Sequence, residues 1–450
     1  MTYTPPAGAG ELVDAIARDG VEFLLVMFVN LHGKPCAKLV PASTAARLAA
    51  EGIGFAGHAA GGLGQSPADP DVVAIPDPRS YMPAPWQDGL AVVQCDLHVE
   101  GEPWPYAPRV VLKRQLERLA ARDMVFKAGA EPEYFLLDRD ADGRLKVADA
   151  LDDAASPCYD ARAATRNLDH LAAVSRAMNR LGWENYSNDH EDANGQFEHN
   201  FGYADALTTA DRVIFLRYMV HTLAQRAGKI ATFMPKPFTG LTGNGLHIHF
   251  SLWSGDDREL FAAADDARGL GLSATGYAFL AGVLDHAPGL MALTCPTVNS
   301  YKRLGAGSGT ASGSSWAPGF ATYGGNNRTQ MLRVPAPGRV EARCVDGAAN
   351  PYLALTGLLA AGLDGLDRSL DPGPPDGRDL ERDAAPGRAL PATLLHAVDE
   401  LSADAVLRAA LGKVPGGEYC DYYARVKREE FAAYHSQVTD WELRHYLLAC

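Results

Sequence analysis

The sequence has few cysteines, and none of them stands in a C-x-x-C pair. Its seven cysteines are scattered over 450 residues and odd in number, which disfavours a disulfide framework and a cysteine-based zinc site. Apolar runs such as Phe23–Val29 are far shorter than the roughly 20 residues that a membrane-spanning helix needs. No basic segment leads into an apolar one at the start, so no secretory signal is visible. These absences predict a soluble, cytoplasmic protein.

Positive charge is also scarce, since 41 lysines and arginines face 55 acidic residues, for a net charge of −14. Nucleic acids and anionic membranes bind basic surfaces, so this balance argues against both as partners. A carboxylate-lined cation site fits the excess, although any acidic protein shares it. No G-x-x-x-x-G-K-[ST] motif is present, which excludes a P-loop. We interpret Gly305–Gly309 as a mobile loop and not as a dinucleotide fingerprint.

The length allows about two or three domains, and a proline-dense join at Glu102–Pro108 indicates one boundary. Before it, short strand and helix patterns alternate in a small module. After it, a strand leads into Ala130–Leu136, and long helical patterns follow. We therefore predict an α+β fold with an N-terminal domain over residues 1–104 and a larger catalytic domain over residues 105–450.

The most informative run is 327–343, which carries four arginines and one carboxylate. Read as a strand, its last part places Arg339, Glu341 and Arg343 on one face, opposite the apolar residues between them. Charged groups in a row are costly unless that face is wet or lines a charged site. Arginine suits phosphate and carboxylate contacts, whereas a glutamate among arginines suits a cation. The alternative is a solvated strand face with ordinary ion pairs.

Glu131 and Glu133 flank a proline and point the same way if the segment is a strand. Pro132 cannot donate a hydrogen bond to a neighbouring strand, which predicts an edge strand or a bulge at this position. A divalent cation would relieve the repulsion between the two carboxylates. The alternative is an exposed acidic edge that deters aggregation.

Two further segments supply acidic and imidazole groups. Residues 189–198 carry carboxylates on both sides of a glycine turn, and taken alone they would read as an acidic surface loop. His247 and His249 share one face of a strand, so as a pair they are better ligand candidates than a single core histidine. Carboxylate-dominated sites with an imidazole suit Mg²⁺ or Mn²⁺ better than zinc. Two such metals beside several arginines are what phosphoryl transfer from a nucleoside triphosphate needs.

In this order the motifs resemble those of the glutamine synthetase superfamily over nearly the whole chain. The matching motifs are Glu131–Glu133, His190–Glu198, Asn244–His249, Asn299–Leu304, Asn327–Pro335, Arg339–Arg343 and Asn350–Leu353. The resemblance implies a β-grasp N-terminal domain on a catalytic domain with a curved, mainly antiparallel sheet flanked by helices. It also implies a homo-oligomer, a double-ring dodecamer with active sites between subunits.

The resemblance further implies two or more Mg²⁺ or Mn²⁺ ions in each active site, with ATP as a co-substrate. One ion would be held by Glu133, Glu191 and Glu198, and the second by Glu131, His247 and Glu341. The implied chemistry is formation of a γ-glutamyl phosphate, followed by attack of an amine.

The remaining implied roles concern substrates. The implied nucleotide contacts are Ser251, Arg328, Arg333 and Arg339. The implied glutamate contacts are Gly245, Arg303 and Arg343. The implied catalytic residues are Arg303, Arg328 and Glu341.

The sequence departs from ammonia-using members of the superfamily at two places. Those members follow Asn299–Leu304 with G-Y-E-A-P, whose glutamate closes the site, whereas no acidic residue occurs here from Gly305 to Gln330. They also have an N-terminal aspartate that helps to bind ammonium, where this chain has Ala56. An aromatic wall attracts an alkylammonium through its π face. The candidates for the amine site are Ala56, His58 as a proton acceptor, Trp316 and Tyr323.

The variant flap resembles that of the glutamate–methylamine ligase (γ-glutamylmethylamide synthetase) branch and its type III-like neighbours. We therefore predict γ-glutamylation of a small primary amine, with methylamine as the first choice. One alternative is an ammonia-dependent glutamine synthetase that takes its acid–base group from His58 or the 186–194 loop. Another is a non-catalytic ring-forming scaffold, which the retained metal and phosphate residues disfavour.

Overall fold

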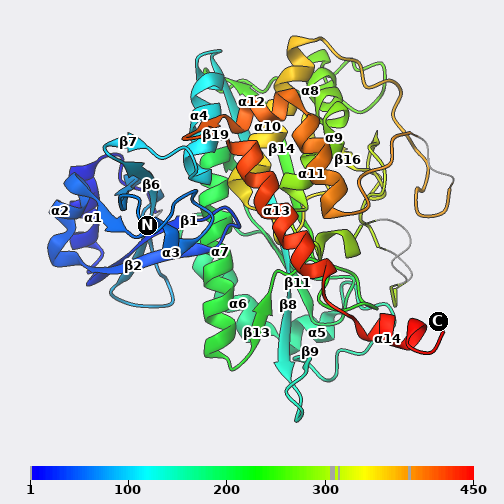
Figure 1. The fold of residues 1–450 in the computed structure, drawn as a ribbon, viewed down its shortest axis with the longest axis horizontal. Coiled ribbons are helices and arrows are strands. Elements are labelled where there is room, and N and C mark those ends of the chain that lie inside the picture. Colours follow the sequence, from blue (N-terminus) through cyan, green and yellow to red (C-terminus); the bar gives the residue numbers. More distant parts are fainter. Residues whose placement is uncertain (1–2, 305–309, 313–314, 384–386, 450) are drawn as a thin grey trace.

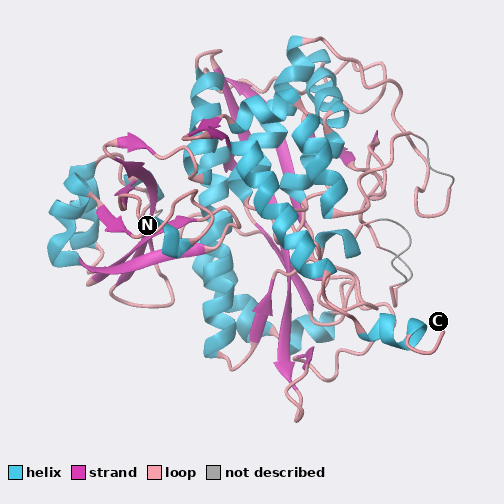
Figure 2. Ribbon diagram, in the orientation of Figure 1, coloured by secondary structure: helices cyan, strands magenta, loops and turns pink. Residues whose placement is uncertain are grey.

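Two β-sheets divide the molecule between the start of the chain and the rest. The computed structural model describes residues 3–304, 310–312, 315–383 and 387–449, so the glycine-rich loop predicted at 305–309 lies outside the described residues. In Figure 1 the N-terminal unit, in blue, lies beside a larger unit in which helices pack over a long sheet. Helices and strands mix in both units (Figure 2), and the predicted α+β class is confirmed.

The N-terminal unit contains a mixed sheet. Its strands are β1 (Phe23–Val29), β2 (Pro35–Pro41), β3 (Ile53–Phe55), β4 (Val72–Pro76), β5 (Met82–Pro83), β6 (Leu90–Val99) and β7 (Glu102–Pro103). They run in the order β2-β1-β6-β4-β3, and β5 and β7 also pair with β6. The β1–β2 turn closes because Asn30 Oδ1 accepts hydrogen bonds from the N–H groups of His32 and Lys34. Gly33 adopts a φ of 72° in this turn, a conformation that glycine reaches without strain.

The helices of this unit are α1 (Ala9–Arg18), α2 (Ala45–Glu51) and α3 (Gly57–Ala60), with 3₁₀ turns η1 (Ala42–Thr44) and η2 (Pro78–Ser80). Leu12, Ala15 and Ile16 are the buried face of α1. They join a hydrophobic core that includes Leu24 and Val93 of the sheet. This core is separate from that of the larger unit.

The larger sheet carries the charged motifs. Its strands are β8 (Met124–Arg139), β9 (Leu145–Val147), β10 (Ser187–His190), β11 (Gln196–Asn200), β12 (Ala204–Asp205), β13 (Ile230–Thr232), β14 (Leu246–Ser254), β15 (Tyr323–Gly324), β16 (Leu332–Ala336) and β17 (Arg339–Ala342). The main order is β10-β11-β8-β14-β17-β16-β15. All of these neighbours are antiparallel except β15 and β16. A short hairpin, β18 (Lys413–Val414) and β19 (Gly417–Glu418), lies apart.

Helices cover the apolar face of this sheet (Figures 1 and 2). They are α4 (Pro108–Ala120), α5 (Ala161–Arg166), α6 (Leu168–Arg180), α7 (Ala206–Arg226), α8 (Ala274–Asp285), α9 (Ala287–Thr294), α10 (Pro351–Asp367), α11 (Leu394–Ala403), α12 (Ala405–Leu411), α13 (Tyr419–His435) and α14 (Asp440–Tyr446), with the 3₁₀ turn η3 (Ser300–Lys302). Both α4 and α7 pack directly against β8. No helix in the described part of the chain is long and apolar enough to cross a bilayer.

Side-chain alternation separates the two faces of the sheet, as the sequence predicts. Along β14, Leu246, Ile248 and Phe250 belong to the hydrophobic core. His247 and His249 therefore point to the opposite face, because successive strand residues alternate. The same alternation on β8 and β17 turns their acidic and basic residues to that face. The apolar face is thus committed to the helices, and the charged face is left for a site.

Pro132 lies neither in an edge strand nor at a recorded bulge, contrary to the sequence-based expectation. It lies inside β8, opposite Leu246 of β14. On the other side of β8, the paired residues end at Glu133 with β11 and resume at Ala128 with β12. Within the described residues, Pro132 therefore sits in a gap of that ladder, where a strand partner is missing. The missing N–H is tolerated because β8 is interior as a strand but locally unpaired.

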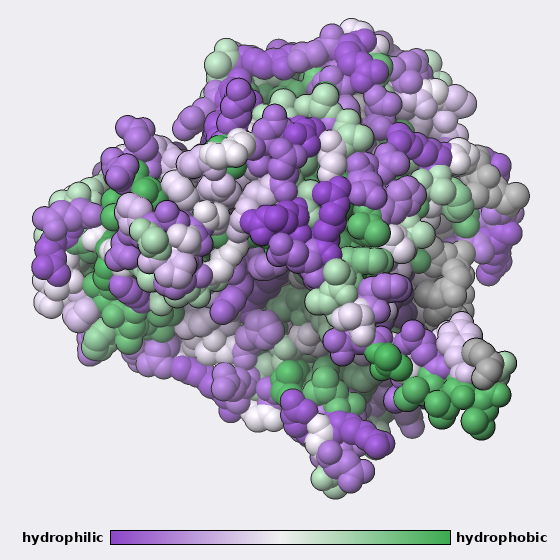
Figure 3. All heavy atoms as spheres, in the orientation of Figure 1, coloured by the Kyte–Doolittle hydropathy of each residue, from purple (hydrophilic) through white to green (hydrophobic). Residues whose placement is uncertain are grey.

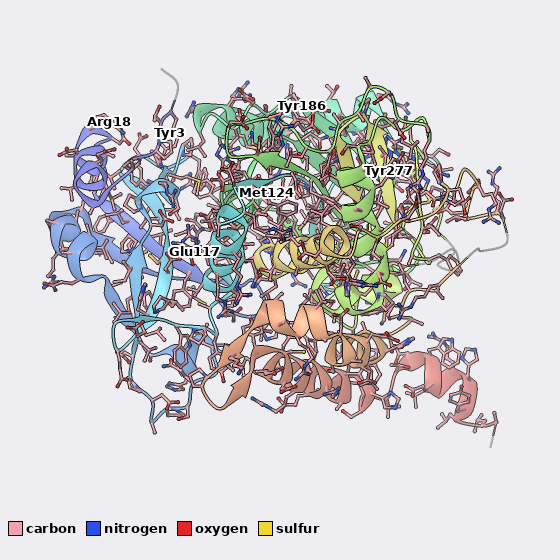
Figure 4. All side chains as sticks on the ribbon, turned by 90° about the horizontal axis from the view of Figure 1, so that it is seen from above. Tyr3, Arg18, Glu117, Met124, Tyr186 and Tyr277 are labelled. Atoms are coloured by element: carbon pink, nitrogen blue, oxygen red, sulfur yellow. The ribbon has the colours of Figure 1, made fainter. Side chains whose placement is uncertain are left out.

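A buried charge network joins the two units. Arg109 of α4 contacts Asp96 at 2.6 Å, Asp77 at 2.8 Å and Asp211 at 2.9 Å. The first two carboxylates belong to the N-terminal unit and the third to α7. The predicted boundary at residues 104/105 falls between β7 and α4. In Figure 4, Tyr3 and Arg18 lie at the end away from Tyr186 and Tyr277 of the larger unit.

Candidate active site

A cavity of about 360 Å³ opens on the charged face of the large sheet. Strands β8, β11 and β14 contribute carboxylates and imidazoles to its lining, and the segments around β16 and β17 contribute arginines. The flap that follows η3 contributes Ser315 and Trp316. The site therefore forms where one sheet face meets one loop.

Strand register explains why distant acidic and imidazole residues converge. Neighbouring strands bring directly opposed residues on the same face to within about 5 Å. Strand β14 lies between β8 and β17, so its histidines meet carboxylates from both sides. The opposed pairs are Glu131–His247, His249–Glu341 and Glu133–Glu198.

Three sets of potential metal ligands form in this part of the described structure. In each set the ligand atoms lie within 4.8 Å of one another. The sets are Asp189–Glu191–Glu198, Glu131–Glu198–His247 and Glu131–His249–Glu341. Carboxylate oxygens with an occasional imidazole are the donors that suit Mg²⁺ or Mn²⁺. The donor chemistry therefore fits the predicted cations.

All six predicted metal ligands lie at this site, but their grouping differs from the predicted sets. Asp189 joins Glu191 and Glu198, where the sequence assigned Glu133. Glu133 Oε2 instead accepts hydrogen bonds from Gly245 N–H at 2.7 Å and from the Gln196 amide at 3.1 Å. Gly245, an expected glutamate contact, thus spends its N–H on a neighbouring carboxylate.

His247 and His249 divide the second predicted set between them. His247 Nδ1 lies 3.7 Å from both Glu131 Oε2 and Glu341 Oε1. His249 Nε2 lies closer to Glu131, at 2.8 Å from Oε1. Both imidazoles of the strand therefore face the same carboxylate, and His249 joins the ligand candidates.

Two of the carboxyl groups resist ionisation. Burial, together with the nearby charges of Glu133 and Asp189, raises the pKa of Glu191 to about 8. Burial and the charge of Glu191 also raise the pKa of Glu198 well above its usual range. Crowded buried carboxylates behave this way because each additional negative charge opposes the next. A divalent cation would remove that opposition, which is a second reason that the cluster fits one.

The other carboxylates are held in the charged form by cationic or imidazole partners. Burial opposes the charge of Glu131, but hydrogen bonds from His247 and His249 outweigh it and depress the pKa. Glu341 is fully buried, and Arg343 and His247 still lower its pKa to about 2. Arg333 Nη1 and Arg343 Nη1 contact its two oxygens at 2.6 and 2.5 Å. Glu341 therefore fixes two arginines of the cavity from beneath.

The arginines differ in how far the protein already satisfies them. Arg343 donates to Glu341, to the Arg328 carbonyl at 3.0 Å and to the Trp316 carbonyl at 3.4 Å. Arg303 is buried, and its Nη1 has no hydrogen-bond partner among the described residues. A buried guanidinium N–H without an acceptor is costly, so Arg303 is the better-placed arginine for a carboxylate substrate. Arg328, Arg333 and Arg339 also line the cavity.

A second cavity of about 330 Å³ adjoins the first and shares Glu131, His249 and Arg339 with it. Its lining is mostly apolar and includes Ser251, which accepts a hydrogen bond from Trp253 Nε1 at 2.9 Å. Lys127 Nζ lies 3.7 Å from the centre of the Trp253 ring. An aromatic pocket that continues into an arginine- and carboxylate-lined cavity suits a nucleotide, with the base in one and the phosphates in the other.

The flap has no carboxylate of its own, but two from other segments reach it. Asp192 Oδ2 accepts hydrogen bonds from Ser312 Oγ at 2.5 Å and Thr242 Oγ1 at 2.6 Å. Glu381 Oε1 accepts from the N–H groups of Ser315 at 2.8 Å and Trp316 at 2.7 Å. Asp192 lines the cavity of about 360 Å³, whereas Glu381 lines a neighbouring one on the other side of Trp316.

The four amine-site candidates do not come together within the chain. Trp316 lines the cavity. Tyr323 does not, because β15 turns it towards Tyr277, where the ring centres are 6.4 Å apart and its hydroxyl donates to the Gly373 carbonyl. Ala56 and His58 lie at α3 of the N-terminal unit, and neither lines either cavity.

Comparison with known proteins identifies the family. A sequence profile described as "Glutamine synthetase, catalytic domain" matches residues 105–446. The chain belongs to the glutamine synthetase family. It is 45% identical to a glutamine synthetase of Rhizobium leguminosarum bv. phaseoli over 95% of this chain and 97% of the relative. It is 43% identical to the glutamate–methylamine ligase of Methyloversatilis universalis strain FAM5, over 95% of this chain and 96% of the relative.

Solved structures agree with this assignment. The structure titled "GmaS/ADP complex-Conformation 1" superposes with a TM-score of 0.91 and 49% identity, covering 98% of this chain and 99% of that chain. The one titled "Apo GmaS without ligand" gives 0.89 and 48%, covering 97% and 99%. Members of the glutamine synthetase family are ATP-dependent ligases that generally use divalent metals, so the predicted enzyme class is confirmed.

Several residues at the glutamine synthetase-type site were missed from the sequence. Alternation along β14 extends from His247 and His249 to Trp253, so that residue could have been found by continuing the pattern. Lys127 stands on the same face of β8 as Glu131 and could have been found in the same way. Glu381 gave no signal, because it lies in a proline- and glycine-rich segment that contacts the flap only through tertiary folding.

Proposed function

We propose that the protein joins L-glutamate to a small primary amine, with methylamine as the preferred acceptor, at the expense of ATP. The observation that carries this proposal is a flap that has no acidic residue of its own and brings Trp316 to the cavity. An indole face attracts alkylammonium ions. The similarity to a glutamate–methylamine ligase and to the GmaS structures supports the same acceptor.

The arginines would act on the anionic substrates. Arg328, Arg333 and Arg339 line the cavity next to the aromatic pocket, where the phosphates of ATP would lie. Guanidinium groups neutralise charge that spreads over the transferred phosphoryl group. Arg303, with its unpartnered Nη1, would hold the α-carboxylate of glutamate. This leaves the γ-carboxylate to attack the terminal phosphate of ATP and form the acyl phosphate.

The carboxylates and histidines would hold two or more Mg²⁺ or Mn²⁺ ions. Asp189, Glu191 and Glu198 would hold one, and Glu131 with His247, His249 or Glu341 would hold another. When bound, such ions polarise phosphoryl oxygens and neutralise their charge. Glu341 has a further role within the protein, since it orients Arg333 and Arg343 at the cavity wall.

Ammonia-dependent glutamine synthesis is the second candidate, and one observation favours it. Asp192 lies in the cavity lining beside the flap, so a carboxylate is available to bind ammonium although the flap itself lacks one. The named glutamine synthetases among the relatives agree with this alternative. The two candidates share every step except the identity of the amine.

An amine panel separates the two functions. We would measure kcat/KM for ammonia, methylamine, ethylamine and a polyamine, with ATP, glutamate and Mg²⁺ in saturating amounts. The proposal requires methylamine to exceed ammonia by roughly tenfold or more, a difference of about 1.4 kcal/mol in transition-state binding. A preference for ammonia would replace the first candidate with the second.

We also propose that the active unit is a homo-oligomer, a double-ring dodecamer in which α3 serves a neighbouring subunit. The C-terminal segment is the most apolar exposed part of the chain, with side chains such as Val438, Trp441 and Leu448 open to solvent. Figure 3 shows this hydrophobic surface at the end of the chain. Exposed patches of this kind mark association sites. Mass photometry of the full chain and of a variant ending at residue 437 tests this, and an unchanged mass for the variant would exclude α14 from the contact.

A further inference from the structure

One carboxylate from outside the flap determines how the flap meets the cavity. Glu381 belongs to the segment 371–383, which the sequence presents as an ordinary surface loop. Its Oε1 accepts hydrogen bonds from Ser315 N–H at 2.8 Å, Ser315 Oγ at 3.0 Å and Trp316 N–H at 2.7 Å. Bonds to an ionised acceptor are about twice as strong as neutral ones. The flap is therefore anchored at the residue that reaches the site.

Trp316 needs such an anchor because its backbone is unusual. Its φ is +49°, in the left-handed region that side chains other than glycine rarely adopt. A bulky residue stays in this conformation only where its surroundings impose it. Glu381 holds its N–H, and Arg343 donates to its carbonyl at 3.4 Å. The two contacts fix the peptide groups on both sides of the indole.

The anchor is itself braced against the base of the flap. Asn327 donates to the Arg378 carbonyl at 2.7 Å, and Leu380 N–H donates to Thr329 Oγ1 at 3.1 Å. These contacts tie the segment that carries Glu381 to the residues on both sides of Arg328. The position of Trp316 is therefore set relative to an arginine that lines the same cavity.

We infer that Glu381 is a positioning residue that sets the size of the amine by fixing Trp316 at the cavity wall. The inference rests on the proposed function. Glu381 acts through Trp316 and not on the substrate, since it lines the adjoining cavity while Trp316 and Arg328 line both. A displacement of about 1 Å at a positioning group can cost up to about 100-fold in rate.

The test is a double-mutant cycle with a chain-length series of amines. The variants are Glu381→Ala, Trp316→Ala and the pair, with Glu381→Gln as the conservative change. Glu400→Gln is the matched control, because Glu400 pairs with Arg388 on the surface and lines neither cavity. The quantities measured are KM and kcat for methylamine and ethylamine, KM for ATP, and the thermal midpoint.

We expect Glu381→Ala to raise KM for methylamine roughly tenfold and to reduce the discrimination against ethylamine, with KM for ATP within about twofold. Glu381→Gln should fall between, because its amide oxygen still accepts the same bonds without the charge. Loss in the double variant should match that of Trp316→Ala alone, since both changes remove one arrangement. Glu400→Gln should behave as the wild type.

Three results would overturn the inference. The first is a folded Glu381→Ala or Glu381→Gln enzyme with wild-type KM and unchanged amine discrimination. The second is an equal loss for ATP and both amines, which indicates a general structural role. The third is additivity of the two alanine changes. If the wild type prefers ammonia, the proposed function fails by itself, and the same cycle run with ammonia decides the positioning role separately.

Discussion

Arg303 combines burial with an unsatisfied donor, a state that a folded protein tolerates where a ligand completes it. Its neighbour Arg343 is already bonded to Glu341 and to two carbonyls. We therefore predict that Arg303→Lys raises KM for glutamate by roughly 10- to 100-fold, because an ammonium cannot reproduce the two-pronged contact of a guanidinium. KM for ATP should stay within about twofold. Steady-state kinetics with glutamate varied check this, and an unchanged KM for glutamate would contradict it.

The carboxylate cluster makes stability depend on pH and on metal together. Glu191 keeps its proton in the folded state up to a pKa of about 8, whereas an unfolded glutamate loses it near about pH 4.3. Between these values the folded state binds more protons than the unfolded state. The free energy of unfolding of the metal-free protein therefore falls as pH rises.

A divalent cation competes with those protons, so its stabilising effect should grow with pH. We predict a larger Mg²⁺-induced rise in Tm at about pH 8.5 than at about pH 6.5, and a smaller pH dependence in Glu191→Gln. Thermal unfolding in EDTA and in Mg²⁺ measures both. Equal Mg²⁺ effects at the two pH values would show that the cluster does not bind the ion.

At the scale of elements, strand β14 serves two substrates from one face. Its first histidine lies among the carboxylates, and Trp253 near its other end lines the aromatic pocket. We predict that Trp253→Ala raises KM for ATP by roughly tenfold, because a base stacked on an aromatic ring loses about 1–3 kcal/mol when the ring is removed. His247→Ala should instead lower kcat. Kinetics with ATP varied separate the two, and equal effects of both changes would contradict this division.

Much of this arrangement could be predicted from residue order, and part could not. Strand alternation alone placed Arg339, Glu341, His247 and His249 on one face, because the period of a strand is local. Which carboxylates share an ion depends on the register between strands, so Asp189 replaced Glu133 in one set. Tyr323 was a reasonable aromatic candidate, but the direction of β15 turns it away, and no local pattern reports that direction.

At the scale of the whole molecule, Arg109 holds the two units together. It is buried among three aspartates, two from the N-terminal unit and one from α7. Removal of one partner from a buried charge network costs about 3–5 kcal/mol. We predict that Arg109→Met lowers Tm markedly, whereas Arg18→Met, which breaks an exposed pair with Asp19, changes stability by about 1 kcal/mol or less. Calorimetry checks both, and a similar Tm for the two variants would contradict the argument.

The carboxylates that grip the flap come from segments that are remote in sequence, one before it and one after it. Acceptor choice is therefore distributed along the chain and is not written in the loop that bears the indole. Two homologues with identical flaps can select different amines if they differ at residues 192 or 381. Engineering of a new acceptor should begin with these anchors, since they can shift the loop without altering any group that binds ATP or glutamate.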